Sequence, residues 1–590
     1  MLTALAWLPL VQAVAIAPPL QAPPLIAAVP PIEGTALPRI PNEFTSLYEV
    51  RPLPGELDST PVFNSNSPEL IQQEGILLST FPADDMANGD AHLDFSFEGR
   101  FDFFAHHIAR GVAYDDRRTL FVGGVIYNPN DEPVTIEIEQ GVSYLSQDAP
   151  FYDLPALRMN PNGDVFAGPG SRTVTDFLQG RGQSQWPQRV VIPPERAYLL
   201  LNAPIPLRRL PFAADATLPP GSILPGAPIT GSGAPVASVI PQGDTRELPS
   251  NGRSLLLHMS SDAPVYAATL AMYAPRTLEG QERAPTLQEW LLLLVNGDLA
   301  GPRDIAPSNP EAYQDSDRSG RFFYGRVAGV AEGSQWSAIA ADSPDDERLT
   351  IPRPGEAIAY VLSTVDYNTF GTQQIQSAPM LARYADTAYR AHGNYGVHYS
   401  VKLPLYNDSD SEQRIIVRLQ TPLQDETLPY GLRFLRNPPN RIFFRGTVRV
   451  QYQTASGQKQ TRYVHVVQRQ GDEGEPLLRI TLPPQAQNNV VVDLIYPPDA
   501  TPPQVLTVST AGIANTRVFE QPEAATPATA IDGEAAVDDD DAASSDPTAE
   551  TSTEPLVDNE SSSLAEEPTP ETDSNLNRSM NEAAVEGDRP

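Results

Sequence analysis

The chain has 590 residues, 62 prolines, no cysteine and a formal net charge of −34. Without cysteine it can have no disulfide framework, thiol nucleophile or thiolate metal site. Nucleic acids and anionic lipids are bound by basic surfaces, so the strongly acidic composition argues against both as partners. At roughly 150 residues per domain, the length suggests about three or four domain-sized pieces.

Residues 1–17 are predicted to be a signal peptide. The segment is apolar and contains Ala13-Val14-Ala15, a small-x-small pattern, so cleavage is expected near Ala15. The usual basic n-region is missing, which leaves the start codon uncertain. The apolar run is too short for a membrane span, and no transmembrane segment is predicted elsewhere. Residues 18–44 are rich in proline and are expected to form an extended linker.

Residues 45–280 are predicted to form a first β-sandwich unit. Their apolar runs are broken by Pro, Gly, Asn or Asp at intervals of about eight to twelve residues, which is typical of antiparallel sandwiches. The runs Leu120–Ile126 and Val134–Ile138, separated by an Asn-Pro-Asn-Asp turn, indicate a half-buried hairpin. The pattern therefore favours a sheet with one face in a core.

Two further features belong to this first unit. A Pro/Gly/Ala/Ser loop at residues 218–242 has no periodicity and is predicted to be flexible. Apolar runs at 255–259 and 265–270 are expected to be two strands joined by a turn at 260–264.

Residues 281–375 are predicted to be a small mixed α/β segment. Its clearest element is a helix at 286–296, because Thr286 is a suitable N-cap and Gly297 a suitable stop. The apolar face of this helix is broad, so we expect it to pack against the body of the protein.

Residues 376–515 are predicted to form a second β-sandwich unit, which repeats features of the first. Tyr399–Leu405, an Asn-Asp-Ser-Asp turn and Ile415–Leu419 again indicate a hairpin, and Arg479–Pro484 resembles Arg189–Pro194. The common order of these segments favours two related antiparallel, immunoglobulin-like units. Asn/Asp turns also occur in unrelated hairpins, so coincidence is the alternative.

Residues 516–590 are predicted to be a disordered acidic tail. From residue 521 onward the chain has 19 Asp or Glu residues, two arginines and no aromatic residue. Such a segment buries too little apolar area to offset the entropy lost on ordering.

A partial calcium-loop pattern occurs at Asp315, Asp317 and Ser319, followed by Gly320. These are oxygen ligands at positions one, three and five with glycine at six. Position twelve is Arg326 instead of glutamate, so a plain polar loop is the favoured interpretation and metal binding the weaker one.

A second candidate is the loop at residues 389–396, in which two glycines permit tight turns. Tyr389, His392, Asn394 and Tyr395 could contact a ligand such as a sugar through hydroxyl, imidazole and amide groups. The same residues could instead form a packed corner whose hydroxyls bond to backbone carbonyls.

Other motifs are weaker. His106 and His107 are neighbours on an expected strand, so they should point to opposite faces and not share a metal. The glycine-rich run at 167–172 lacks the spacing and lysine of a phosphate loop, so a structural turn is expected there. No G-x-S-x-G or H-E-x-x-H motif occurs, and neither a catalytic residue nor a cofactor is predicted.

As a set, several segments resemble a largely cyanobacterial family of exported proteins with a domain of unknown function, the DUF3370 family. The resemblance covers about residues 45–512 and implies export in a cyanobacterium, but it supplies no activity, substrate or site residue. The segments that carry it are Arg51–Gly55, Phe104–Ile108, Ala167–Gly170, Tyr324–Val330, Tyr389–Gly396 and Ile495–Gln504.

Two functions are compatible with these features. The first is an exported, non-enzymatic protein of the periplasm, cell surface or medium that binds or organises envelope polysaccharide or a surface protein. The alternative is a carbohydrate-active enzyme, or its accessory carbohydrate-binding module, with paired acids among the many carboxylates. The sequence does not indicate an oligomeric state.

Overall fold

The computed structural model describes residues 42–148, 151–210, 217–225, 247–311, 322–424 and 431–511. The predicted signal peptide with Ala15, the linker up to residue 41, loop residues 226–242 and the acidic tail lie outside these ranges. Residues 312–321, with Asp315, Asp317 and Ser319, also lie outside them. The protein is mainly β, with 48% strand and 5% helix.

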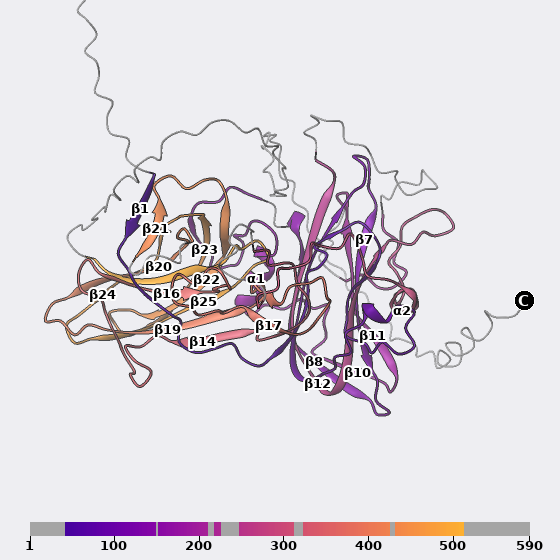
Figure 1. The fold of residues 1–590 in the computed structure, drawn as a ribbon, viewed down its shortest axis with the longest axis horizontal. Coiled ribbons are helices and arrows are strands. Elements are labelled where there is room, and N and C mark those ends of the chain that lie inside the picture. Colours follow the sequence, from indigo (N-terminus) through magenta and orange to yellow (C-terminus); the bar gives the residue numbers. More distant parts are fainter. Residues whose placement is uncertain are drawn as a thin grey trace, which may run out of the picture. The chain divides into compact units, whose positions relative to one another are not determined.

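The largest sheet has twelve strands, and several of them are labelled in Figure 1. Its main path is β10-β8-β12-β6-β3-β13-β17-β18, while β4, β5, β7 and β11 pair beside it. The strands are β3 (Pro61–Ser65), β4 (Leu70–Ile71), β5 (Gly75–Ser79), β6 (Phe97–Arg110), β7 (Thr119–Asn128), β8 (Val134–Leu145), β10 (Arg189–Ile192), β11 (Arg196–Pro206), β12 (Ser250–Tyr273), β13 (Ala328–Glu332), β17 (Ala378–Arg383) and β18 (Arg390–Ala391).

The long strand β12 connects the two layers of this sheet. Its first half pairs with β6 and β8, and its second half pairs with β5 and β7. The register against β6 shifts between Ser261 and Val265, so the turn expected at 260–264 is instead an irregularity within one strand. Pro264 cannot donate to a ladder, which suits it to a position where the strand changes partners.

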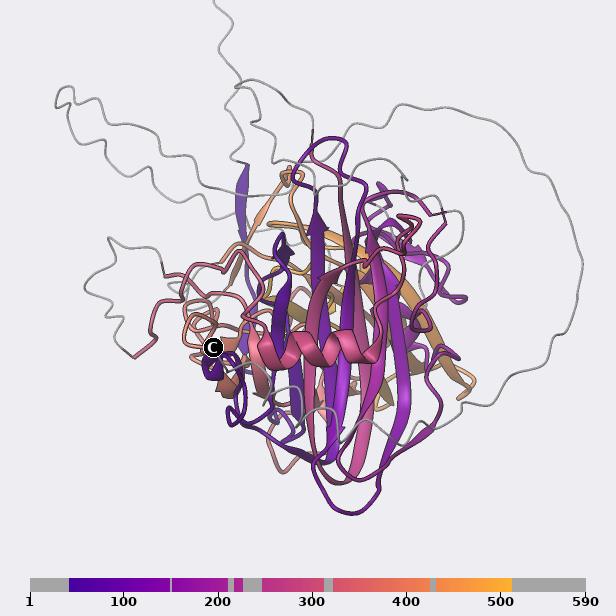
Figure 2. The same cartoon turned by 90° about the vertical axis from the view of Figure 1, so that its right-hand side faces the viewer.

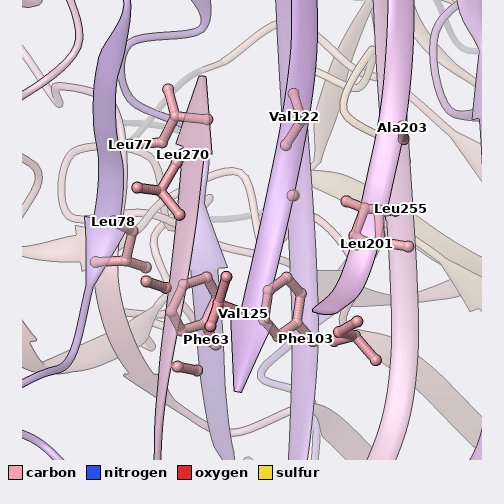
Figure 3. Close-up of a cluster of buried hydrophobic side chains, with 14 of the residues drawn as sticks. Phe63, Leu77, Leu78, Phe103, Val122, Val125, Leu201, Ala203, Leu255 and Leu270 are labelled. Carbon is pink, nitrogen blue, oxygen red and sulfur yellow. The ribbon is translucent and has the colours of Figure 1, made fainter. Parts of the chain in front are cut away.

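The first hydrophobic core lies between the two layers that β12 joins. Phe103 and Leu255 come from one layer, and Val125 and Leu201 from the other (Figure 3). All four side chains are at most 1% exposed. Each buried side chain of this size stabilises the fold by about 1.5–3 kcal/mol relative to its exposed state.

Two smaller sheets surround the second core. The seven-stranded sheet contains β9 (Leu157–Met159), β14 (Gln335–Ile339), β15 (Leu349–Thr350), β19 (His398–Tyr406), β22 (Ile442–Gln453), β23 (Lys459–Arg469) and β25 (Gln487–Ile495). The five-stranded sheet contains β2 (Glu49–Arg51), β16 (Ala357–Leu362), β20 (Gln413–Gln420), β24 (Pro476–Leu482) and β26 (Gln504–Thr510). A separate pair is formed by β1 (Glu43–Ser46) and β21 (Leu432–Leu435). One buried cluster contains Val401 and Val492 of the seven-stranded sheet together with Val417 and Val508 of the five-stranded sheet.

The sheets are mixed, so the prediction of purely antiparallel units was wrong in this respect. Parallel pairs join β3 and β4 to β6, β14 and β15 to β19, and β2 to β16. Parallel neighbours require a crossover connection. Alternation within one strand indicates which face is buried but does not identify a partner that comes from a distant segment.

The strands of the two predicted hairpins form as β7 and β8 and as β19 and β20, but they do not pair with each other, so the hairpin predictions were wrong. β7 pairs with β11 and the second half of β12, whereas β8 pairs with β10 and the first half of β12, and β19 and β20 belong to different sheets. The two connecting turns nevertheless have matching hydrogen bonds. The Asn128 side-chain amide donates to the carbonyls of Glu132, Ile192 and Pro193 at 2.8–3.1 Å. Asn407 donates to the carbonyls of Ser411, Leu482 and Pro483 at 2.8–3.0 Å. In each case one buried asparagine ties the turn to the end of the strand that precedes an equivalent Pro-Pro corner.

The helix expected at 286–296 is α2 (Leu287–Asn296). Thr286 and Glu289 form a capping box, and Gly297 is the C-cap. The helix lies across strands of the largest sheet (Figure 2) and contacts β5 and β12. Trp290 packs onto Gly123 of β7, where a Cβ atom would lie 2.5 Å from the indole.

A second helix, α1 (Ser171–Leu178), follows the glycine-rich run, which is the structural turn that the sequence indicated. Gly170 is its N-cap with a φ of 68°, a conformation that glycine adopts without strain. α1 contacts β8 and β12 as well as β22 and β25. Val174 and Phe177 share a third buried cluster with Leu256 and Ile495, so α1 links the two cores. The remaining helical turns are η1 (Gly89–Ala91) and η2 (Ser146–Asp148).

Candidate functional site

A serine, a histidine and a glutamate form a chain on one face of β6 and β12. Ser254 Oγ lies 2.9 Å from His106 Nδ1, and His106 Nε2 lies 3.5 Å from Glu69 Oε1. An ionised carboxylate can only accept, so Nε2–H of His106 points at Glu69. The order hydroxyl, imidazole, carboxylate is that of an activated nucleophile.

The chain of Ser254, His106 and Glu69 is not accessible to a substrate. Ser254 is 2% exposed and His106 is 1% exposed. The backbone of Gly170 covers the serine: a Cβ atom there would lie 3.3 Å from Ser254 Oγ and 2.3 Å from Pro498. Neither of the two cavities described below includes Ser254 in its lining. We therefore interpret the chain as a structural network.

Charged groups extend this network. Arg326, the residue at calcium-loop position twelve, pairs with Glu69 and lies 3.4 Å from Asp304. Burial would raise the pKa of Glu69, but the contacts with His106 and Arg326 outweigh it, and the pKa lies below its ordinary value. Burial raises the pKa of Asp304. Arg326 therefore forms ion pairs with Glu69 and Asp304.

His107 points to the other face of β6, as alternation predicts. Its Nδ1 lies 2.9 Å from the carbonyl of Pro68, which can only accept, so Nδ1 carries the hydrogen. Its Nε2 then accepts from Ser65 at 2.8 Å, and Ser65 accepts from Thr269 at 2.8 Å. Burial lowers the pKa of His107 to about 4, so the ring is neutral at pH 7.

The loop at residues 389–396 is built of internal contacts. The Asn394 amide donates to the Gln376 carbonyl at 2.9 Å and to Tyr399 at 3.0 Å, and Tyr395 donates to the Ala500 carbonyl at 3.2 Å. These are the contacts of a packed corner, the alternative that the sequence left open.

The other two residues of that prediction are also engaged. The guanidinium of Arg383 lies over the ring of Tyr389 at 3.7 Å. His392 is 8% exposed and lies 3.4 Å from Asp366. Burial lowers the pKa of His392 to about 3. Of the four residues, Tyr395 lines the small cavity described in the last subsection of the Results.

An open cavity of about 490 Å³ lies between η2 and the segment that leads through β9. Its size falls in the range of small-molecule sites. We call it the Tyr152 cavity; its lining residues are Gln147, Tyr152, Leu154, Arg158, Asp164, Val165 and Phe166.

The polar groups of the Tyr152 cavity are available to a ligand. Tyr152 is 61% exposed, and Arg158 and Asp164 are also exposed. Within the described residues, neither charged side chain has a hydrogen bond or an ion pair. An aromatic ring, a guanidinium, a carboxylate and the Gln147 amide therefore face one solvent-filled space.

Arginines support the aromatic rings around this cavity. Arg172 of α1 lies 3.8 Å from the ring centre of Tyr144 and 5.1 Å from that of Phe166. Arg445 lies over Phe151 at 4.7 Å and pairs with Asp499. Of these three rings, Phe166 lines the cavity, so its contact with Arg172 helps to hold one wall of the cavity in place.

Sequence reasoning missed this cavity. Its one local signal is the aromatic doublet Phe151-Tyr152 between two prolines, in a segment without periodicity. The partners that complete it belong to η2 and to residues beyond β9, and their proximity depends on the pairing of β9 with β23.

Two further observations concern metal binding and membrane-spanning helices. Among the described residues no cluster of three or more His, Cys, Asp or Glu side chains could hold a metal ion. In the same part of the chain, no helix has the length and apolarity needed to cross a membrane.

A family model described as "Protein of unknown function (DUF3370)" matches residues 48–510, which confirms the resemblance. No curated protein matches the chain. Lac15 from a marine microbial metagenome is 10% identical, with 71% of this chain and 90% of that chain covered and a TM-score of 0.08. Procruciferin, an 11S globulin from Brassica napus, is 7% identical, with coverages of 75% and 85% and a TM-score of 0.09. At these TM-scores neither structure supports an argument.

Proposed function

The chain belongs to the DUF3370 family, and we propose that it is an exported, non-enzymatic protein that binds envelope polysaccharide through the Tyr152 cavity. The observation that carries this proposal is the combination of an exposed aromatic ring with unpaired polar groups in one open cavity. The periplasm, the cell surface and the medium are the compartments in which such a protein would meet its ligand.

The chemistry of the cavity suits a sugar unit. The apolar face of a sugar ring can pack on Tyr152, while its hydroxyls can donate to Asp164 and accept from Arg158. The cavity is open, so a longer chain could continue past the bound unit. An apolar ligand would leave the guanidinium and the carboxylate desolvated and unpaired, which is costly.

We further propose that two related, immunoglobulin-like sandwich units form the rigid frame for this site. The matching hydrogen bonds of Asn128 and Asn407 support this relation. The Tyr152 cavity lies on the chain segment that leaves β8 and joins the seven-stranded sheet through β9.

A carbohydrate-active enzyme is the second candidate. Glycoside hydrolysis ordinarily uses two carboxyl groups on either side of the scissile bond. Among the described residues that line the Tyr152 cavity, Asp164 is the one carboxylate. This supports binding over hydrolysis at this site.

Binding to isolated envelope polysaccharide tests the proposal. We expect Tyr152→Ala to weaken binding about tenfold, on the order of 1.4 kcal/mol, because it removes the stacking platform. Phe323→Ala is the matched control, since Phe323 is also exposed, at 40%, and does not line the cavity.

Equal binding by the wild type and Tyr152→Ala would place the site elsewhere, and no binding by the wild type would refute the proposal. Because Tyr152 and Phe323 are both exposed, each variant should retain the wild-type melting temperature.

Fractionation of native cells tests export. We expect the protein in the washed envelope, the periplasm or the medium, with an N-terminus near residue 16 after cleavage at Ala15. Full-length protein in the cytoplasm would contradict the signal-peptide prediction and, with it, a role in the envelope.

A further inference from the structure

A second, much smaller cavity lies under the corner formed by residues 395–397. Its volume is about 10 Å³. The described residues around it come from β3, β6, β12, β13, β17, β18 and the following loops: Val62, Asn64, Asp102, Phe104, Leu256, Ala331, Gly333, Ser334, Ala378, Ala391, Tyr395, Gly396 and Val397. A volume near 10–15 Å³ is about that needed for one water molecule.

Two buried acceptors in this cavity lack a donor. Asn64 Oδ1 and Asp102 Oδ1 have no hydrogen-bond partner, and their residues are 4% and 2% exposed. In the parallel pairing of β3 and β6, Val62 lies opposite Asp102 and Asn64 opposite Phe104. Alternation therefore places both polar side chains on the face that this cavity adjoins.

The other carboxylate oxygen of Asp102 is already engaged. Asp102 Oδ2 lies 3.2 Å from His258 Nε2 and 3.7 Å from Arg100. The Asp102 carboxylate thus has one oxygen close to basic groups and one without a donor, and Asp102 is among the residues that line the cavity. Buried polar atoms without a partner are rare in native proteins and commonly mark an ordered water.

We propose that a single water molecule occupies this cavity and donates one hydrogen to Asn64 Oδ1 and the other to Asp102 Oδ1. The match is stoichiometric, since water has two donor hydrogens and the cavity has two acceptors without a donor. A calcium ion needs six to eight oxygen ligands and magnesium an octahedral set, which the two acceptors of this cavity do not supply. The absence of a three-ligand cluster among the described residues agrees with water over a metal.

The water would act as a structural bridge. It would satisfy the two acceptors on a sheet face that is otherwise apolar, where residues 395–397 pack against β3 and β6. Through Asp102 it is also connected to His258, whose side chain is 20% exposed.

A crystal structure of the full chain tests the proposal directly. We expect one density peak within about 2.7–3.2 Å of both oxygens. Three results would overturn the proposal: an empty cavity, an Asn64 amide turned to donate directly to Asp102, or a peak with the coordination of a metal ion.

Water ¹⁷O relaxation dispersion in solution provides the variant test. Asn64→Leu fills the cavity with apolar atoms and removes one acceptor, so the signal should fall by one long-lived water. Asn489→Leu is the control, because Asn489 is exposed and does not line this cavity. An unchanged count in Asn64→Leu, or the same loss in both variants, would contradict the assignment. If Asn64→Leu does not fold, the wild-type density alone decides.

Discussion

His465 is an example of a single residue whose burial sets a pH dependence. The ring is 0% exposed in β23, and within the described residues neither nitrogen has a hydrogen-bond partner. Burial lowers the pKa of His465 to about 4, and the nearby positive charge of Arg445 acts in the same direction. The unfolded chain binds the proton near pH 6.5, so this group destabilises the fold as the pH falls from about 6.5 to 4.

We predict that His465→Leu reduces the loss of stability on acidification. In the wild type, the difference between the folded and unfolded pKa values lowers the free energy of unfolding by about 3 kcal/mol as the pH falls from 6.5 to 4. The variant should not show this part of the loss. Leucine has a similar volume and no group to protonate, and no hydrogen bond of His465 is lost. The measurement is the free energy of unfolding at pH 7.5 and at pH 4.5 for the variant and the wild type.

His107→Leu provides the contrast. The pKa of His107 is also lowered to about 4 by burial, but its ring bonds to Ser65 and to the Pro68 carbonyl. This variant should therefore lose stability already at pH 7.5, because it leaves buried partners unsatisfied. If His465→Leu loses as much at pH 7.5 as His107→Leu, the account of His465 is wrong.

At the scale of elements, the turn from β7 to β8 and the turn from β19 to β20 each depend on one asparagine that ties the turn to a distant strand end. Asn128 and Asn407 are both 0% exposed, and each donates to three carbonyls. The corners that follow are also alike, since Glu195 and Gln485 both have positive φ values, 53° and 56°. The two sites are therefore physically equivalent.

We predict that Asn128→Ala and Asn407→Ala destabilise the protein by similar amounts, each about 3 kcal/mol, because buried carbonyls lose their donor. Chemical denaturation measures the effect, with the exposed Asn489→Ala as a control that should change little. A large effect at one asparagine and none at the other would argue against equivalent units.

Local patterns in the sequence predicted the elements that depend on neighbouring residues. The strands β7, β8, β19 and β20 follow from alternation between turns, although they do not pair as the predicted hairpins, and α2 follows from its capping residues. The passage of β12 between two layers was not predicted, because Ser260–Pro264 has the composition of a turn and its extended form depends on pairing with other strands. The parallel partners of β6 and β19 were missed for the same reason.

The candidate site was less predictable than the fold. The residues singled out at 389–395 are chemically versatile, but their polar atoms bond to Gln376, Tyr399 and Ala500. The Tyr152 cavity has ordinary side chains in an irregular segment, and they become a site only when β9 joins β23. The residue types indicated which chemistry was possible. They did not indicate which side-chain groups remain available to a ligand after the protein has packed.

At the scale of the whole molecule, the hydrophobic clusters account for the stability of the described chain. Their members fall between Leu53 and Val508. The third cluster combines side chains of both β regions, including Leu256 and Ile495. The two cores should therefore unfold together.

We predict that a chain ending at Arg517 keeps the wild-type melting temperature and a single cooperative transition. No member of the buried clusters is removed, and residues 521–590, which are removed, hold 19 of the 74 Asp and Glu residues of the chain. Differential scanning calorimetry on both chains measures this. A large fall in melting temperature, or two separated transitions, would show that the account of the cores is incomplete.

The most direct test of a binding function without catalysis is one incubation with two readouts. Purified full-length protein is mixed with isolated envelope polysaccharide, and both the bound protein and newly formed reducing ends are measured over time. We predict saturable binding that Tyr152→Ala weakens, with no increase in reducing ends. Release of reducing ends by the wild type would establish the enzyme alternative, and an absence of binding would contradict the role assigned to the Tyr152 cavity.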